Sequence, residues 1–331
     1  MRRGFFILLK QKMYLILFDD HSWDNLLPLT FTRPVSGLRV GILTIEEKWE
    51  KILGTPVSHI TRDHLKNKFP CSTGEDNLIV NGSLLPDGNV VKALMALDQG
   101  QGLRKGKTLL GVRIDQASTE QFSTDQWIEK AMDYTDEVSL VDFPWKVFSL
   151  NGQEIQADFE LVTRDRNGVQ LSETVRVLHP DMIFAEPGFK GEFITLNATD
   201  GPIYLGADSE IMEGSTIRGP FALCEESVVK MAAKLYGPTT IGPYSKVGGE
   251  INNSVLQANS NKTHDGFLGN AVIGEWCNLG ADTNNSNLKN IYGEVKIWNY
   301  PEKQFIGTGR QFCGLIMGDH SKCGINTMFN T

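Results

Sequence analysis

The feature that most constrains the fold is a run of aliphatic residues that recur at every sixth position in the second half of the chain. Eight follow one another at this spacing: Leu205, Ile211, Ile217, Leu223, Val229, Leu235, Ile241 and Val247. Neither an α-helix, with about 3.6 residues per turn, nor a β-strand, with its period of two, produces this spacing. It predicts a six-residue structural unit with one inward aliphatic side chain per unit.

The repeat continues beyond residue 247 with two changes of phase. The predicted inward positions are then Val255, Asn261, Phe267, Ile273 and Leu279, followed in a third phase by Met317, Cys323 and Phe329. Three such units make one coil of a left-handed parallel β-helix, the fold that we expect for residues 191–331. Glycines directly after inward positions, such as Gly206 and Gly242, and asparagines between residues 252 and 299 suit its tight corners.

The part of the chain before the repeat is predicted to be α/β. Strand-length apolar runs and segments of helical spacing alternate, at residues 14–18, 45–53, 78–80, 90–97 and 109–112. This alternation favours a parallel sheet with helices on both faces, whose ligands bind at the carboxyl ends of the strands. We expect a Rossmann-like α/β domain over residues 13–190. The last coil, near Thr331, reads as unfinished, which suggests a truncated C-terminus.

Composition excludes several classes of partner. The chain of 331 residues carries 32 basic and 40 acidic residues, a net charge of -8, so a broad basic surface for nucleic acid or anionic membranes is not expected. Its five cysteines show no Cys-x-x-Cys spacing, which favours a reducing cytoplasm over a disulfide framework or a zinc site. The basic and apolar run at residues 2–9 is too short for a signal peptide, because Lys10 and Lys12 interrupt it.

The segment 262–287 resembles the active-site coil of the bifunctional uridylyltransferase/acetyltransferases that make UDP-N-acetylglucosamine, especially their alternative form with a divergent nucleotidyltransferase domain. It contains Lys262-Thr-His264-Asp-Gly-Phe-Leu-Gly-Asn270 and then Asn278-Leu-Gly-Ala281. The better-known enzymes have Gly-His-Leu-Thr-Tyr-Leu-Gly-Asp and Asn-Ile-Gly-Ala-Gly-Thr at these places. The resemblance implies that His264 is the general base, that Asn278 and Asn287 hold the amino sugar and its amine, and that Ala281 meets the acetyl-CoA thioester.

The same resemblance extends to the sugar phosphate. Lys234 falls on an arginine that binds the phosphate, whereas Phe267 and Asn252 stand where the better-known enzymes have a tyrosine and a lysine. Acetylation of an amine requires a base, and an imidazole, with an unperturbed pKa near about 6.5, suits this role at neutral pH. The acyltransferase assignment is therefore supported by chemistry as well as by resemblance.

The first half of the chain resembles the sugar nucleotidyltransferases less completely. Leu27-Pro-Leu-Thr-Phe-Thr-Arg33-Pro34 is similar to the end of that family's signature loop, and Val80-Asn81-Gly-Ser83 to its Val-Asn-Gly-Asp strand end. The resemblance implies that Arg33 and Asn81 bind the substrate. Three features depart from the family: residues 18–25 lack the phosphate-binding glycines, Ser83 replaces a metal-binding aspartate, and the lysine that follows Arg-Pro is missing, although Arg39 lies nearby.

These departures leave two interpretations of the first half. In one, Asp19, Asp20 or Asp24 binds Mg²⁺ and Arg33 binds phosphate, so that the chain also transfers uridylyl from UTP. In the other, this half has lost catalysis and binds a sugar phosphate or serves in assembly.

The predicted activity is acetyl transfer from acetyl-CoA to an amino-sugar 1-phosphate, with glucosamine 1-phosphate as the expected acceptor. The resemblance implies a homotrimer in which acetyl-CoA lies between neighbouring chains. A noncatalytic trimeric scaffold is the alternative from another class of function.

Overall fold

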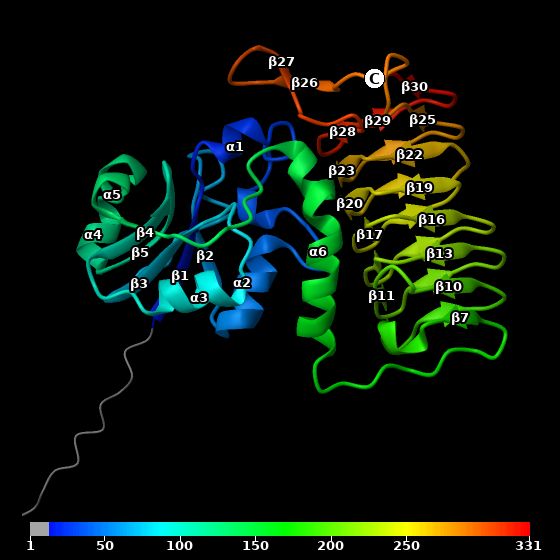
Figure 1. The fold of residues 1–331 in the computed structure, drawn as a ribbon, viewed down its shortest axis with the longest axis horizontal. Helices are drawn as coiled ribbons and strands as arrows, with labels where there is room; N and C mark the ends of the chain where they lie inside the picture. Colours follow the sequence, from blue (N-terminus) through cyan, green and yellow to red (C-terminus); the bar gives the residue numbers. More distant parts are fainter. Residues whose placement is uncertain (1–12) are drawn as a thin grey trace, which may run out of the picture. The chain divides into compact units, whose positions relative to one another are not determined.

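The computed structural model describes residues 13–331, which divide into two compact units (Figure 1). The first unit contains residues 13–20 and 46–140, and the second contains residues 21–45 and 141–331. The predicted division between residues 190 and 191 differs from this one, because residues 21–45 and 141–190 pack with the coils of the second unit. The run at residues 2–9 lies outside the described part. No helix within residues 13–331 has both the length and the apolarity of a membrane span.

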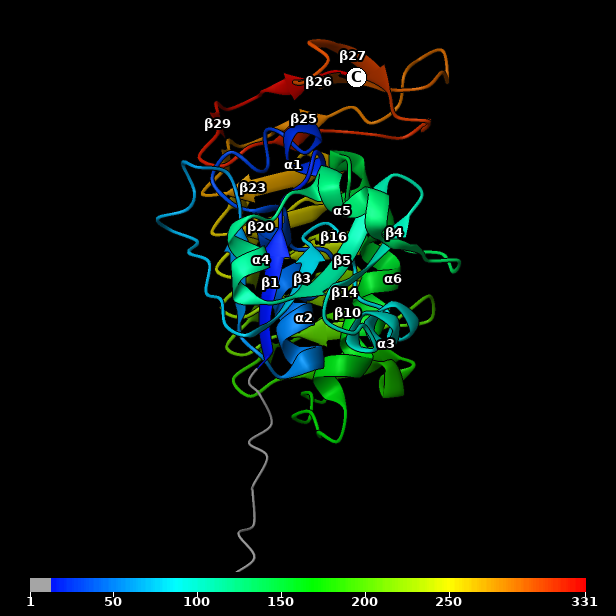
Figure 2. The same ribbon diagram turned by 90° about the vertical axis from the view of Figure 1, so that its left-hand side faces the viewer.

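The first unit is built on one mixed sheet with the strand order β2-β1-β3-β5-β4-β6. Figure 2 labels its strands β1, β3, β5 and β4. Its strands are β1 (Met13–Phe18), β2 (Val57–Ile60), β3 (Asp76–Asn81), β4 (Gln101–Lys105), β5 (Thr108–Ile114) and β6 (Met132–Asp133). Strands β2, β1 and β3 are parallel as predicted, but β5 is antiparallel to both β3 and β4. The prediction of a parallel sheet is wrong at β5. Only Gly106 and Lys107 separate β4 from β5, and so short a connection joins antiparallel strands.

Helices cover both faces of this sheet, as predicted. They are α2 (Ile45–Leu53), α3 (Gly88–Met95), α4 (Gln116–Glu120) and α5 (Thr124–Lys130). Val112 of β5 packs with Trp127 and Ile128 of α5, whereas the neighbouring Gly111, on the opposite face, lies against Leu94 of α3. Because β1, β2 and β3 are parallel, their carboxyl ends meet at one edge of the sheet.

The second unit contains a parallel β-helix of three sheets, in agreement with the predicted left-handed fold. Sheet I consists of β7 (Arg176–Leu178), β10 (Thr195–Asn197), β13 (Thr216–Arg218), β16 (Lys234–Tyr236), β19 (Glu250–Asn252) and β22 (Phe267–Gly269). Sheet II consists of β8 (Ile183–Ala185), β11 (Ile203–Leu205), β14 (Phe221–Leu223), β17 (Thr239–Ile241), β20 (Val255–Ala258), β23 (Val272–Glu275) and β28 (Ile316–Met317). Sheet III consists of β9 (Lys190–Gly191), β12 (Glu210–Ile211), β15 (Val228–Val229), β18 (Lys246–Val247), β21 (Asn261–Lys262), β24 (Asn278–Leu279) and β29 (Lys322–Cys323).

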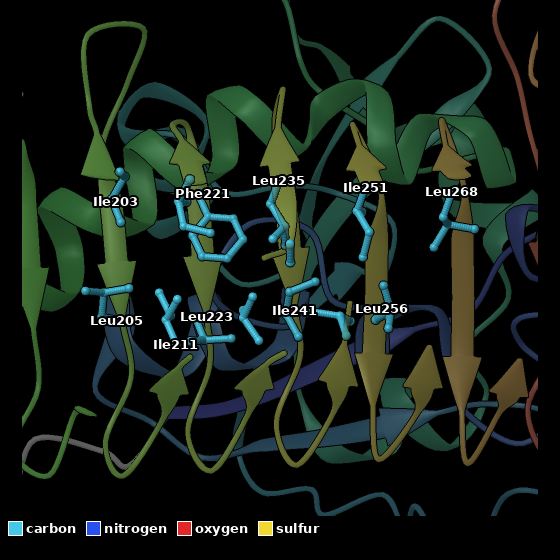
Figure 3. Packing of buried hydrophobic residues seen from close by; sticks show 14 of the residues in the cluster. Ile203, Leu205, Ile211, Phe221, Leu223, Leu235, Ile241, Ile251, Leu256 and Leu268 are labelled. Carbon is cyan, nitrogen blue, oxygen red and sulfur yellow. The ribbon is translucent and has the colours of Figure 1, made fainter. Parts of the chain in front are cut away.

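The eight aliphatic residues of the strict repeat all point into the β-helix and are buried, as Figure 3 shows for several of them. The prediction is wrong for part of the second phase. Leu256, Lys262 and Leu268 face inward there, whereas Asn261 is exposed and Phe267 is half-buried. The cause is two short steps, of four residues from Val247 to Ile251 and of five from Ile251 to Leu256, which place the next inward residues one position later than predicted. A further five-residue step, from Leu268 to Ile273, restores the predicted phase. Ile273, Leu279 and Met317 are buried in the core as predicted.

The glycines and asparagines of the coils have different roles. A Cβ atom on Gly242 would lie 1.9 Å from the carbonyl oxygen of Gln257 in the next coil, so only glycine fits there. Asn253, Asn259 and Asn270 adopt positive φ angles of 46°, 51° and 50° at corners, a conformation that asparagine tolerates well. The predicted αL corners are therefore confirmed at these three asparagines.

Helix α6 (Pro144–Thr163) lies along sheet II within the second unit (Figure 1). It binds the segment 21–45, which contains α1 (Ser22–Asn25) and the 3₁₀ turn η1 (Val35–Gly37). The buried Asp158 carboxylate accepts hydrogen bonds from the backbone NH groups of Ile42 and Leu43 at 2.8 and 3.0 Å. The amide oxygen of Asn151 accepts from Gly41 N at 2.7 Å and from the Thr240 hydroxyl at 3.0 Å. These bonds fasten the segment to the β-helix.

The last coils contain an insertion. A second 3₁₀ turn, η2 (Pro180–Met182), lies in the first coil, and the late elements are β25 (Asn284–Asn285), β30 (Met328–Phe329) and the hairpin of β26 (Lys296–Asn299) with β27 (Gln304–Gly307). The hairpin interrupts the coil between β25 and β28.

Candidate functional site

The carboxyl edge of the first unit's sheet gathers polar side chains from three strands. Asp20, after β1, accepts a hydrogen bond from Asn81 Nδ2 at 2.9 Å, and Asp19 accepts from the Thr61 hydroxyl at 2.5 Å. The Asn81 oxygen accepts from the Ser83 hydroxyl at 2.8 Å. Asn81 is fully buried, so its amide orients Asp20. The residue that replaces the expected aspartate, Ser83, thus supports Asn81.

The carboxylates of this edge suit a cation only in part. No cluster of three or more metal-binding side chains occurs within residues 13–331. Asp19 and Asp20 nevertheless fit a Mg²⁺ ion, because with nucleotides this ion commonly binds one or two carboxylates together with substrate phosphates. Asp24 belongs to α1 of the second unit, and its role at a Mg²⁺ site stays a prediction.

Arg33 lies in the second unit and is bound to the β-helix. Its guanidinium donates to Glu275 at 2.7 Å and to Asp319 at 2.5 Å, and Asp319 also accepts from the Thr32 hydroxyl. Burial opposes the charge, but the carboxylates of Asp319 and Glu275 outweigh it and raise the pKa of Arg33. The predicted phosphate-binding role of Arg33 stays a prediction, although its side chain is already paired with two carboxylates.

Arg39 is held in a similar way. Its backbone NH donates to Gln257 Oε1 at 2.6 Å, and Gln257 Nε2 donates to the Arg39 carbonyl at 3.1 Å. Its side chain donates to the carbonyl oxygens of Gln257 and Ile42. Both arginines near the nucleotidyltransferase-like motif are therefore buried and bonded within the second unit.

His264 lies at the corner between β21 of sheet III and β22 of sheet I. Its side chain is exposed and borders a cavity of about 560 Å³ that Lys230, Met231 and Asp265 also line. Within the described part of the chain, the imidazole makes no hydrogen bond. This corner, residues 263–266, is called the His264 corner below.

The acceptor residues implied by the resemblance occupy the outer face of sheet I beside this corner. Lys234 of β16 is exposed and lies in register with Glu250 of β19, which in turn pairs with Phe267 of β22. Asn252 follows on β19. The face thus presents Lys234 on the same sheet as Phe267, the strand residue that directly follows the His264 corner.

The remaining predicted residues divide between two corners of the coil. Asn278 is exposed on β24, and Ala281 follows it at the corner one coil beyond the His264 corner, where its carbonyl accepts from Asn326 N at 2.8 Å. Asn287 lies near the carboxyl end of β22, on the other side of sheet I from the His264 corner, and its amide donates to Asn270 Oδ1 at 2.7 Å. Asn287 lines a separate cavity of about 550 Å³ together with Arg310. A single chain therefore does not bring His264 and Asn287 into one cavity.

Several polar residues of these sites were not found from the sequence. Arg62 donates to the Asp20 carbonyl at 3.2 Å, Arg310 enters the Asn287 cavity from the inserted segment, and Lys262 is buried inside the coil. Lys262 immediately precedes the conspicuous Thr263 and His264, yet the expected phase placed Asn261 inward. The short steps from Val247 to Ile251 and from Ile251 to Leu256 were the signal that could have identified it.

Comparisons with known proteins agree with this architecture. Residues 15–167 match the family model described as sugar nucleotidyl transferase. The chain is 33% identical over 128 residues to the bifunctional sugar-1-phosphate nucleotidylyltransferase/acetyltransferase of Sulfurisphaera tokodaii, and this match covers 38% of this chain and 31% of that protein. It is 23% identical over 235 residues to the bifunctional protein GlmU of Synechococcus elongatus, and this match covers 64% of this chain and 48% of that protein. Each of these matches spans less than half of the relative's length.

Proposed function

We propose that the second unit transfers acetyl from acetyl-CoA to an amino-sugar 1-phosphate. Two findings support this: residues 15–167 match the sugar nucleotidyl transferase family model, and the chain is similar to bifunctional nucleotidylyltransferase/acetyltransferases. Glucosamine 1-phosphate is the proposed acceptor. The observation that carries the proposal is the exposed His264 imidazole beside a β-helix face that presents Lys234.

In the proposed reaction the amine nitrogen of the sugar attacks the thioester carbonyl carbon of acetyl-CoA. A nitrogen–carbon bond forms, the carbon–sulfur bond breaks, and CoA leaves as its thiol. The imidazole of His264 takes the proton that the amine loses and returns it to the departing sulfur. Lys234 pairs with the sugar phosphate, and Asn278 orients the acceptor.

We further propose that the site is completed by a neighbouring chain in a homotrimer. His264 and Asn287 line different cavities of one chain, and both face outward on the β-helix. A neighbouring copy would place its own residues beside His264, with acetyl-CoA at Ala281 between the two chains.

A second activity, uridylyl transfer from UTP, is favoured by the polar edge at Asp19, Asp20 and Asn81. Mg²⁺ bound by the two aspartates would neutralise triphosphate charge there. The pairing of Arg33 with Glu275 and Asp319 favours the alternative, in which this half binds a sugar phosphate without turnover.

A coupled assay separates these functions. The chain is incubated with acetyl-CoA and glucosamine 1-phosphate, and free thiol is measured; UTP and Mg²⁺ are then added and pyrophosphate is measured. Release of thiol followed by pyrophosphate supports both activities, and thiol alone supports acetyl transfer only. If a folded trimer releases neither product with several amino-sugar phosphates, the acetyltransferase proposal fails and the scaffold interpretation takes its place.

A further inference from the structure

The interior of the β-helix contains one lysine. Lys262 occupies an inward position of sheet III, directly in register with Val247 of the preceding coil. In the same column the other coils place Ile211, Val229 and Leu279 inward. The Lys262 side chain is only 1% exposed, so its ammonium lies inside a column of aliphatic side chains.

The ammonium of Lys262 is directed to the His264 corner. It donates to the carbonyl oxygen of His264 at 2.7 Å and more weakly to that of Gly248 at 3.4 Å. No carboxylate lies within ion-pair distance of it in the described part of the chain, although Asp265 and Asp282 are near enough to favour its charge. A buried ammonium costs several kcal/mol unless hydrogen bonds compensate it, so an aliphatic residue here would give a more stable core.

The His264 corner also differs from the other corners between sheets III and I. Ala232, Asp282 and Asn326 take positive φ angles of 56°, 55° and 58° at such corners, and each of Ala232 and Asn326 donates its NH to a carbonyl of the adjacent coil. Gly214 and Gly249 also take positive φ angles, of 76° and 75°, at such corners, and in all of these the positive φ falls two or three residues after the inward residue. In the His264 corner it falls on Gly266, at 120°, four residues after the inward Lys262. The carbonyl of His264 turns inward and is bound by a side chain.

We propose that Lys262 is a positioning residue that fixes the His264 corner from inside the β-helix and so sets the direction of the catalytic imidazole. The proposal rests on the proposed acetyltransferase function. Lys262 touches neither substrate, because it is buried beneath the corner; it acts through the main chain of His264. The cost of its burial is explained if the reaction requires a main-chain geometry that the ordinary corner does not provide.

The test compares Lys262→Met with two other variants in the full chain. Lys262→Met keeps the length of the side chain but removes the donors. Val229→Ala makes a small cavity in the same inward column two coils away and controls for loss of core stability. Lys262→Gln keeps an amide donor and serves as the conservative variant, and also as the second variant if Lys262→Met does not fold.

We expect Lys262→Met to lower kcat for acetyl transfer by about tenfold or more, since small misplacements of a reacting group have effects of this size, while the KM values for both substrates change less than about twofold. Lys262→Gln should recover part of kcat, and Val229→Ala should keep it. An unchanged kcat in folded Lys262→Met, or an equal loss in Val229→Ala, overturns the proposal.

Crystal structures of the wild type and Lys262→Met give a second readout that does not depend on activity. We expect the main chain of residues 263–266 to move while the corner at residues 280–283 stays in place. An unmoved His264 corner overturns the proposal. If the wild type transfers no acetyl group, the acetyltransferase function fails, and the structures still decide whether Lys262 holds the corner.

Discussion

The two regions that sequence resemblance marks as catalytic differ in how their key side chains are held. Arg33, in the nucleotidyltransferase-like motif, is buried and its guanidinium is paired with Glu275 and Asp319. His264, in the acyltransferase-like coil, is exposed and its imidazole has no hydrogen-bond partner within residues 13–331, although Lys262 binds its carbonyl from inside. A motif identifies residues of the right type, but their neighbours decide whether the functional atoms are available to a substrate.

The largest expected effect concerns the exposed side chain of His264. His264→Ala should lower acetyl transfer by about 10²-fold or more, because general base catalysis contributes on the order of 10² to 10⁴. Thiol release from acetyl-CoA measures the effect, and sedimentation measures the assembly, which should not change. His179→Ala is the matched control, because His179 is also an exposed histidine at a coil corner. Equal activity in both variants would remove His264 from the mechanism.

The second prediction concerns the pH dependence of stability at the His264 corner. Burial lowers the pKa of Lys262 from 10.5 to about 8, against the favourable effect of Asp265 and Asp282. Between these values the unfolded chain binds a proton that the folded chain has released, so the folded state gains stability as the pH rises. The unfolding free energy of the wild type minus that of Lys262→Met should therefore rise by roughly 3 kcal/mol from below pH 8 to above pH 10.5.

Urea titrations of both proteins at several pH values measure this difference. The other titrating groups are common to the two chains and largely cancel. Lys246→Met, which removes an exposed lysine from the neighbouring strand β18, should show a nearly constant difference. A constant difference for Lys262→Met as well would contradict the burial of a charged ammonium.

The third prediction tests the ion-paired side chain of Arg33. Arg33→Met should lower the free energy of unfolding by about 2–3 kcal/mol, because it leaves Asp319 buried without its partner; the effect is reduced because Glu275 is 33% exposed. Asp319→Asn added to Arg33→Met should recover part of the loss. Arg218→Met is the control, since Arg218 contacts Asp200 at the same 2.5 Å but both side chains are half exposed. A loss no larger than that of the control would mean that the buried pairing does not stabilise the segment.

The smallest expected effect concerns the acceptor. Lys234→Met should raise the KM for glucosamine 1-phosphate by about tenfold, which corresponds to ~1.4 kcal/mol, while kcat stays near the wild-type value. Steady-state kinetics with varied sugar phosphate measure it. Lys190→Met, which removes an exposed lysine from β9 in the first coil, should leave the KM unchanged. An unchanged KM in Lys234→Met would place the phosphate elsewhere.

The fold was largely predictable because its repeat is local. Each inward aliphatic residue from Leu205 to Val247 needs only the same spacing in the next unit, so periodicity alone identifies the coils. The α2 helix at Ile45–Leu53 and the strand β1 were likewise found from spacing and length. The antiparallel pairing of β5 and the inward position of Lys262 were missed. The first depends on a two-residue connection, and the second on two short steps of the repeat between Val247 and Leu256.

By itself, the sequence determined that this protein contains a β-helix and an α/β unit, and it located the exposed His264 and Lys234. Only the tertiary structure decided which groups were already paired. The segment 21–45 follows strand β1 of the first unit in sequence but packs with the second unit, where Arg33 meets carboxylates 242 and 286 residues away. Such partners leave no local pattern, because a buried ion pair depends on long-range contacts and not on spacing along the chain.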